Sequence, residues 1–289
     1  MNTTELIDTL KIKGSFPTSN DLFSNSDYLN LFNHQLKVDI VPLLIRLNEE
    51  FFLQYVDFTI VQGSKYRIPK RAIGAKLRDL KAMDSQGNFT NLDRLFEEDR
   101  NTAKSGYYIT RNSVELSKDF SSGTLRMSYF ARPSTLVLPT SCAQVDSINT
   151  SLNQVVVTSA PSAFATNTVV DFVQNNNPYD LLGFDFSISS VSGTTLAFSS
   201  LPEGLEEGDW ICLACESPVP MIPEELHPVL VQSALVSALS SKKDKALEVE
   251  MQVLMQNKQD AINMLEPRVE NNSSKIRSGR LLSYFSGGF

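Results

Sequence analysis

The spacing of apolar residues changes twice along this chain of 289 residues, and this change constrains the fold more than any single motif does. Apolar residues recur every three or four positions in residues 1–55 and again in 223–265, which is the spacing of amphipathic helices. Between these regions, short runs alternate apolar and polar residues and are bounded by glycine, proline or asparagine, as antiparallel strands are. The sequence therefore predicts helices, a β-rich middle and helices again.

The first helical region contains a proline. One helical face is formed by Leu29, Phe32, Leu36, Ile40, Leu44 and Leu47. Pro42 lies within this series and lacks a backbone donor, so we expect it to kink or divide the helix. A second helix that begins at Pro42 is equally acceptable, because proline suits the first helical turn.

The second helical region predicts a pair of helices separated by the polar stretch 240–243. The apolar positions of the first helix are Val229, Leu230, Val231, Ala234, Leu235, Ala238 and Leu239, and those of the second are Leu247, Met251, Leu254, Ala261 and Leu265. The second helix would be roughly 33 Å long at about 1.5 Å per residue. A narrow apolar stripe of that length requires another helix to pack against, either in the same chain or in a neighbouring copy.

The simplest closure pairs the helices of the two ends. We therefore expect an α+β fold, in which a helical bundle of N- and C-terminal helices carries a large antiparallel β-rich insertion of the sandwich or barrel type. The predicted domains are helices in 1–55, the insertion in 56–217, the C-terminal helix pair in 218–266 and an extended basic arm in 267–289.

Charge is distributed unevenly. The chain has a formal net charge of −7, but 267–289 contains four basic residues and one acidic residue, so this segment is +3 and the remainder is −10. An acidic body argues against general nucleic-acid binding. The N-terminal residues lack the pattern of a signal peptide, apolar runs are too short to cross a bilayer, and three cysteines form no disulfide framework. We expect a soluble protein made in a reducing cytoplasm, with no membrane partner.

Motifs that would indicate catalysis or metal binding are weak. Cys212 and Cys215 form a CxxC pair, but the pair lies in or at the end of a strand rather than at a helix start, so two small buried or half-buried side chains are expected. The two histidines, His34 and His227, do not form an HExxH motif, and no phosphate-binding glycine loop is present. We predict no catalytic residue, no cofactor and no metal site.

Charged residues form several clusters along the chain. Adjacent glutamates at 49–50, 97–98 and 206–207 point in different directions, so they favour solvated faces over a glycosidase site. The densest basic cluster consists of Arg67, Lys70, Arg71, Lys76 and Arg78. Its strand alternation places Lys76 and Arg78 on one face, which either meets phosphates or acidic protein or is simply solvated.

Three stretches resemble head-to-tail adaptor proteins of tailed bacteriophages. They are "RAIGAKLRDLKAMDSQGNFTNL" (71–92), "LRMSYFARPSTLVLP" (125–139) and "GDWICLACESPVPMIPEELHPVLVQSAL" (208–235). The resemblance extends over most of the chain from Arg71 onward, and includes the order of a strand-rich middle, a proline-rich return, a helix pair and a loose tail.

The resemblance implies a structural virion protein, located in the neck of the virion and made in the host cytoplasm. It would form a ring of twelve copies beneath the portal protein, contact a tail or nozzle protein, and let DNA pass without sequence-specific binding. The subunit or portal interface would include Leu230, Leu235, Leu239, Leu247, Met251, Leu254, Arg268, Lys275, Arg277 and Arg280. Other interpretations are a nozzle or tube protein of the same virion, a virion-associated cell-wall hydrolase, or a nucleic-acid-binding protein.

Overall fold

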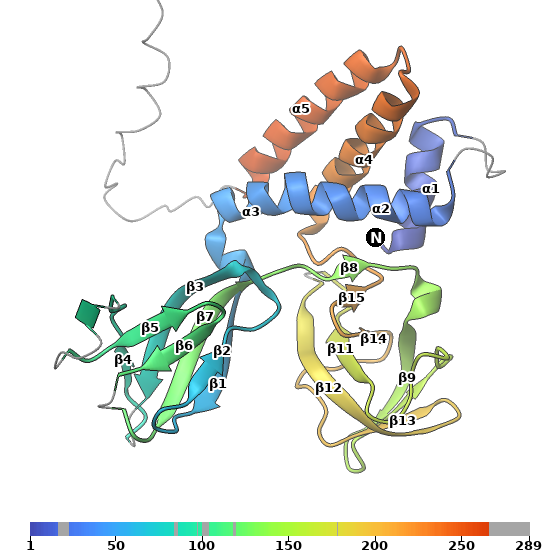
Figure 1. Ribbon diagram of the computed structural model, residues 1–289. Coiled ribbons are helices and arrows are strands. Elements are labelled where there is room, and N and C mark those ends of the chain that lie inside the picture. The colour runs from blue at the N-terminus through green and yellow to red at the C-terminus, as the bar shows by residue number, and fades with distance from the viewer. Residues whose placement is uncertain are drawn as a thin grey trace, which may run out of the picture.

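The chain folds into a helical part and two β units, which lie next to each other beneath the helices (Figure 1). This computed structural model describes residues 1–16, 23–83, 86–96, 98–99, 104–117, 120–177 and 179–265. Both ends of the described chain contribute to the helical part, and the two β units follow each other in the sequence between them.

The helical part contains α1 (Thr3–Lys13), α2 (Asn25–Gln35), a π-helical turn (Leu36–Ile40), α3 (Val41–Leu47), α4 (His227–Lys242) and α5 (Leu247–Leu265). Capping boxes begin the first two helices: the Asn2 side chain caps α1 with Glu5, and the Ser24 side chain caps α2 with Asp27. These side chains satisfy backbone N–H groups that have no partner within the helix, which fixes where each helix begins.

The predicted division at Pro42 is confirmed. The regular α-helix ends at Gln35, one π-helical turn follows, and α3 begins at Val41 with the proline in its first turn. Proline cannot donate the backbone hydrogen bond that a continuous α-helix requires, and the wider π turn accommodates this loss.

Helix α4 lies at the centre of the helical core. It packs against α1, α2 and α5, and its residues Leu230, Val231 and Ala234 have no exposed surface. The same core includes Leu6 and Leu10 of α1. Because each fully buried aliphatic side chain of this size contributes about 1.5–3 kcal/mol, a helix that is apolar on nearly all sides is stable only when other helices surround it.

The first β unit consists of two small sheets. Its strands are β1 (Leu53–Thr59), β2 (Lys65–Arg67), β3 (Ala72–Met83), β4 (Phe89–Asn91), β5 (Tyr107–Thr110), β6 (Ser113–Leu116) and β7 (Thr124–Ala131). One sheet has the order β1-β7-β3-β4 and the other β2-β6-β5. Leu125 and Met127 on β7 and Val114 on β6 lie in one core that the two sheets share. We call these two sheets together the sheet unit.

The second β unit is a closed barrel. Its strands are β9 (Ala143–Asn149), β10 (Gln154–Val157), β11 (Val169–Val173), β12 (Leu181–Ser192), β13 (Thr195–Phe198) and β14 (Trp210–Leu213). They pair antiparallel in the order β10-β13-β12-β11-β14-β9, and β9 pairs with β10 to complete the circle. Phe172 lies at the centre of the barrel core, with its ring centroid 5.2 Å from that of Phe186 and 5.1 Å from that of Phe198.

Short elements connect the parts. Strands β8 (Thr135–Leu136) and β15 (Glu216–Ser217) form a small parallel pair, and single turns of 3-10 helix lie at Glu49–Phe52, Pro139–Ser141 and Glu224–Leu226. The Asn33 side chain of α2 bonds both backbone groups of Leu136: its Nδ2 donates to the carbonyl at 2.9 Å, and its Oδ1 accepts from the N–H at 2.7 Å. Asn33 thereby fixes the helical part on the connection that leads into the barrel.

The predicted fold class is wrong. The protein is not a helical bundle with one β-rich insertion but a β-rich fold that includes a closed six-stranded antiparallel barrel. Alternation of apolar residues indicates that strands form, but it does not show which distant strands pair. The barrel closes through pairs such as Ile211 with Ala143, which are far apart in the sequence, and no local pattern indicates this pairing.

Candidate functional site

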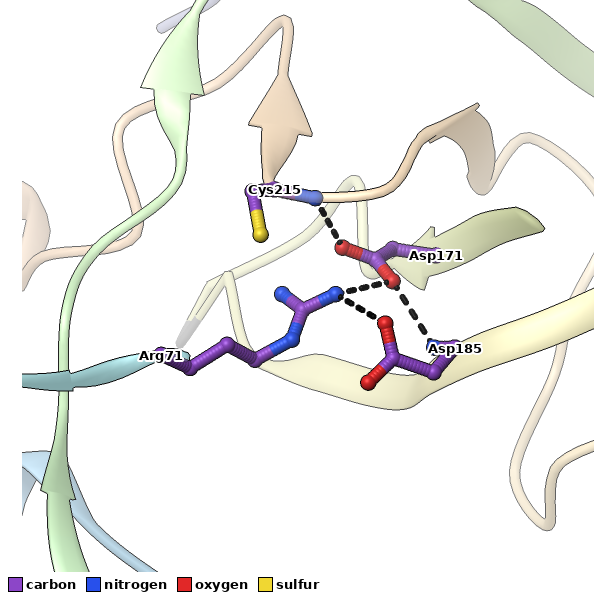
Figure 2. A network of polar contacts seen from close by, with 4 residues as sticks. All are labelled: Arg71, Asp171, Asp185 and Cys215. Atoms are coloured by element: carbon purple, nitrogen blue, oxygen red, sulfur yellow. Dashed lines mark hydrogen bonds and ion pairs between the residues drawn. The ribbon is translucent and has the colours of Figure 1, made fainter. Parts of the chain in front are cut away.

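A buried polar network joins the sheet unit to the barrel. Arg71 lies just before β3, and its side chain is only 7 % exposed. Its Nη2 donates to a carboxylate oxygen of Asp171 on β11 at 2.8 Å and to one of Asp185 on β12 at 2.9 Å (Figure 2). A single guanidinium of the sheet unit is thus held by two strands of the barrel.

Asp171 organises the network. Its side chain has no exposed surface, and its carboxylate also accepts the backbone N–H of Asp185 at 3.0 Å and that of Cys215 at 2.8 Å (Figure 2). Burial raises the pKa of the Asp171 carboxyl, while the Arg71 charge and the two backbone donors act against that rise. Because a carboxylate accepts hydrogen bonds at both oxygens, this set of donors suits the ionised form.

The network has a structural character. Burial alone would lower the pKa of Arg71, but its hydrogen bond to Asp185 and the charge of Asp171 raise it, so the guanidinium stays charged. The Arg71 guanidinium is therefore fixed in its charged form, and the donors that surround Asp171 suit a carboxylate. The arrangement joins the sheet unit to two strands of the barrel through charged hydrogen bonds.

A small cavity of about 50 Å³ lies next to the network. Arg71 and Tyr129 line it together with Phe51, Gln54 and Phe184, so residues from the turn after α3, the sheet unit and the barrel meet there. The Nε of Arg71 is buried and has no hydrogen-bond partner among the described residues. Pockets for substrates or cofactors usually measure about 300–1,000 Å³, whereas this volume suits one or two water molecules.

The residues considered for catalysis do not converge. Among the described residues, no group of three or more His, Cys, Asp or Glu side chains could hold a metal ion. His227 is fully buried beside Tyr179, with ring centroids 5.1 Å apart, and burial together with the neighbouring Met1 ammonium lowers its pKa to about 4. In the CxxC pair, Cys212 is buried and Cys215 is exposed. No helix in the described part of the chain has the length and apolar character needed to cross a membrane.

The basic cluster is split by the fold. Arg71 is buried in the network, so it cannot meet a phosphate at the surface. Lys76 and Arg78 are both exposed on β3, where the register with β7 shifts between Leu77 and Asp79. Arg78 pairs with Glu50 at 3.1 Å, and the Lys76 Nζ lies 5.3 Å from the centroid of the Phe130 ring. Glu50 thus belongs to a surface ion pair, and Glu97 lies outside the described residues.

The partners of Arg71 were not predicted. Asp171 interrupts the apolar run "VVDFV" (169–173), and a carboxylate in a buried strand requires a partner because an isolated buried charge is costly. That interruption is the signal that could have indicated the site, although it does not identify Arg71 as the partner.

The predicted interface residues of α4 lie inside the chain. Leu230, Leu235 and Leu239 are buried in the helical core, with 0 %, 1 % and 4 % of their surface exposed. On α5, Leu247 and Leu254 pack partly against the same core, and Met251 is 41 % exposed. The seam of α5 thus packs against helices of its own chain, and contact of these residues with a second subunit or the portal stays a prediction.

The basic residues of the predicted arm, Arg268, Lys275, Arg277 and Arg280, lie outside the described residues. Their proposed contact with the portal also stays a prediction.

The exposed surface of α5 is unusually apolar. Thirteen large hydrophobic side chains of described residues are exposed, and five of them lie on this helix of 19 residues. They are Val249, Met251, Val253, Met255 and Met264. Such a concentration on one helix is typical of a surface that binds another protein.

Comparison with known proteins gives no assignment for this chain. No protein-family model matches it, and no curated protein sequence matches it.

Proposed function

We propose that this chain is a structural virion protein of a tailed bacteriophage, which forms a ring beneath the portal and joins the capsid to the tail around the DNA channel. The resemblance of residues 71–92, 125–139 and 208–235 to head-to-tail adaptor proteins supports this assignment. The exposed apolar surface of α5 is the structural observation that carries the part of the proposal concerning assembly.

The apolar residues of α5 lie on two opposite flanks of the helix. Met251 and Met255 are four positions apart and Val253 and Met264 eleven positions apart, so at about 100° per residue each pair lies within roughly 40° on the helix. Met255 and Met264 are nine positions apart, which places them about 180° from each other. We call the first pair the Met255 flank and the second the Met264 flank.

Two opposite flanks suit a ring. In a ring each subunit contacts its two neighbours through different surfaces, whereas a two-fold dimer uses one surface twice. A helix that is apolar on both flanks can stand between the equivalent helices of its neighbours, with its inner face on its own core. The polar outer positions, such as Gln252, Gln256 and Gln259, would then stay in contact with solvent.

The proposed ring is tested by blocking one flank at a time. Met255→Glu places a charge on the Met255 flank and Met264→Glu on the Met264 flank, while Gln256→Glu adds the same charge at an exposed outer position. We expect each methionine variant to prevent ring formation on the portal, and the glutamine variant to form rings as the unmodified chain does. Measurement uses analytical ultracentrifugation of the chain with the portal protein from the same genome.

Mixing the two methionine variants distinguishes a ring from a two-fold dimer. Each variant retains one intact flank, and the two intact flanks are complementary, so the mixture is expected to form pairs but no ring. If both variants still form full rings, α5 is not the contact between subunits. If neither the unmodified chain nor any variant binds the portal protein, the proposed adaptor function itself is wrong.

A second candidate is another tail component of the same virion, such as a nozzle or tube protein. The exposed flanks of α5 favour assembly in both cases. A tail component would form a ring without the portal, so comparison of the mass with and without the portal separates the two functions. The net charge of −10 over residues 1–266 suits the wall of a channel through which DNA slides, because like charges repel and the DNA does not bind.

A further inference from the structure

Two of the three cysteines lie opposite each other on neighbouring strands of the barrel. Cys212 lies on β14, and Cys142 immediately precedes β9 with extended backbone angles, φ −115° and ψ 165°. The pairing of Trp210 with Gln144 and of Ile211 with Ala143, continued by one step, places Cys212 opposite Cys142. Side chains at opposite positions of an antiparallel pair point to the same face, so the two thiols face the same space.

The type of strand pair also suits a covalent bond. The N–H of Val145 donates to the carbonyl of Asp209, so these two residues form a hydrogen-bonded pair. Hydrogen-bonded and non-hydrogen-bonded pairs alternate along an antiparallel ladder, which makes Cys142 and Cys212 a non-hydrogen-bonded pair. In such a pair the Cα atoms are about 4.5 Å apart, within the range of about 4.4–6.8 Å that a disulfide spans.

The two thiols lie in a dry environment. Cys142 is 3 % exposed and Cys212 is 0 % exposed, and both belong to one apolar cluster with Trp210 and Val219. Burial is the main cause that raises the pKa of Cys212, and the neighbouring Cys142 side chain raises it further. The thiol form is therefore favoured, and reaction with an oxidant requires β9 and β14 to separate locally.

We propose that Cys142 and Cys212 are a disulfide site, which closes the seam between β9 and β14 when the protein meets a two-electron oxidant of the azo or small-disulfide class. The two thiols lose two protons and two electrons and form one S–S bond. The oxidant gains them: an azo compound becomes a hydrazine, and a small disulfide becomes two thiols. Cys215 is exposed and takes no part. This inference is independent of the proposed function.

The experiment uses the full chain and the azo oxidant diamide. After oxidation, the free cysteines are alkylated in denaturant and the intact mass and peptides are measured. We expect a mass lower by two hydrogens, one alkylated cysteine where the untreated protein has three, and a peptide pair joining residues 142 and 212. We also expect the melting temperature to rise by several degrees and to return to its starting value with a reductant, because a cross-link between distant residues restricts the unfolded chain.

Variants separate this site from the two other possible cysteine pairs. Cys215→Ser is expected to form the same bond, whereas Cys142→Ser and Cys212→Ser are expected to lose it. A bond between Cys212 and Cys215, or three alkylated cysteines after prolonged oxidation, would each overturn the proposal. The unmodified chain alone gives this answer, so it does not depend on whether the serine variants fold.

Discussion

Replacement of Arg71 by methionine should strongly destabilise the protein. Methionine resembles the unbranched aliphatic part of the arginine side chain but has no charge and no donor. The Asp171 carboxylate would keep its backbone donors from Asp185 and Cys215, but it would lose the one side-chain partner that it has among the described residues, while its side chain remains fully buried. An unpaired buried charge is costly because the surroundings cannot solvate it.

The magnitude follows from the difference in burial between the two carboxylates, because Asp171 is fully buried and Asp185 is not. Removing one partner of a buried ion pair costs about 3–5 kcal/mol, so Arg71→Met should reduce the free energy of unfolding by this amount. Asp185 also pairs with Arg71, but its side chain is 58 % exposed. Asp185→Asn is therefore the matched control, and it should cost less than about 1 kcal/mol, as partly solvated ion pairs do.

Urea unfolding measured by tryptophan fluorescence tests this prediction. Trp210 is the only tryptophan in the chain and is 8 % exposed on β14, so its emission reports the barrel. The double variant Arg71→Met with Asp171→Asn removes both charges and should recover part of the loss. If Arg71→Met costs no more than Asp185→Asn, the network is not a significant link between the sheet unit and the barrel.

Three further changes have expected outcomes. His227 has a pKa of about 4 in the folded chain and 6.5 in the unfolded chain, so on acidification the unfolded chain binds the proton first. The unmodified protein should therefore lose up to about 3 kcal/mol of its free energy of unfolding between pH 6.5 and pH 4. His227→Gln should abolish this pH dependence, as measured by urea unfolding at each pH. Asn33→Ala leaves the N–H and carbonyl of Leu136 without their amide partner, and should reduce the free energy of unfolding by about 1–3 kcal/mol, measured by thermal unfolding followed by circular dichroism. Asn33→Gln retains the amide on a longer side chain and should not restore the lost stability. Phe172→Ala should cost about 3–5 kcal/mol because it opens a cavity at the centre of the barrel, and unchanged urea unfolding would contradict that packing.

Elements with a strong local signal were predictable from the sequence. The helical spacing around Leu36 and Leu44 indicated the N-terminal helices, and the chemistry of Pro42 indicated their division. The stripe of α5 was also recognised, and the structure shows that Leu247 and Leu254 use it to pack within the chain. Such predictions succeed because hydrogen bonds and side-chain packing within a helix depend on neighbours three or four residues away.

Features that depend on distant partners were not predictable. The basic cluster around Arg71 was identified, but its carboxylate partners Asp171 and Asp185 are about a hundred residues away on other strands. The closed barrel was missed as a unit for the same reason. On α5, the spacing rules placed Met251 in the same stripe as Leu247 and Leu254, whereas the structure shows that Met251 is exposed and that only the other two pack against the core.

The most direct test of the central claim is the mass of the purified chain in solution, measured by light scattering alone and after addition of the portal protein from the same genome. The proposed adaptor should give a stoichiometric ring bound to the portal, and the mass should correspond to twelve copies on a portal of the same symmetry. A chain whose mass is unchanged by the portal would contradict the proposed function.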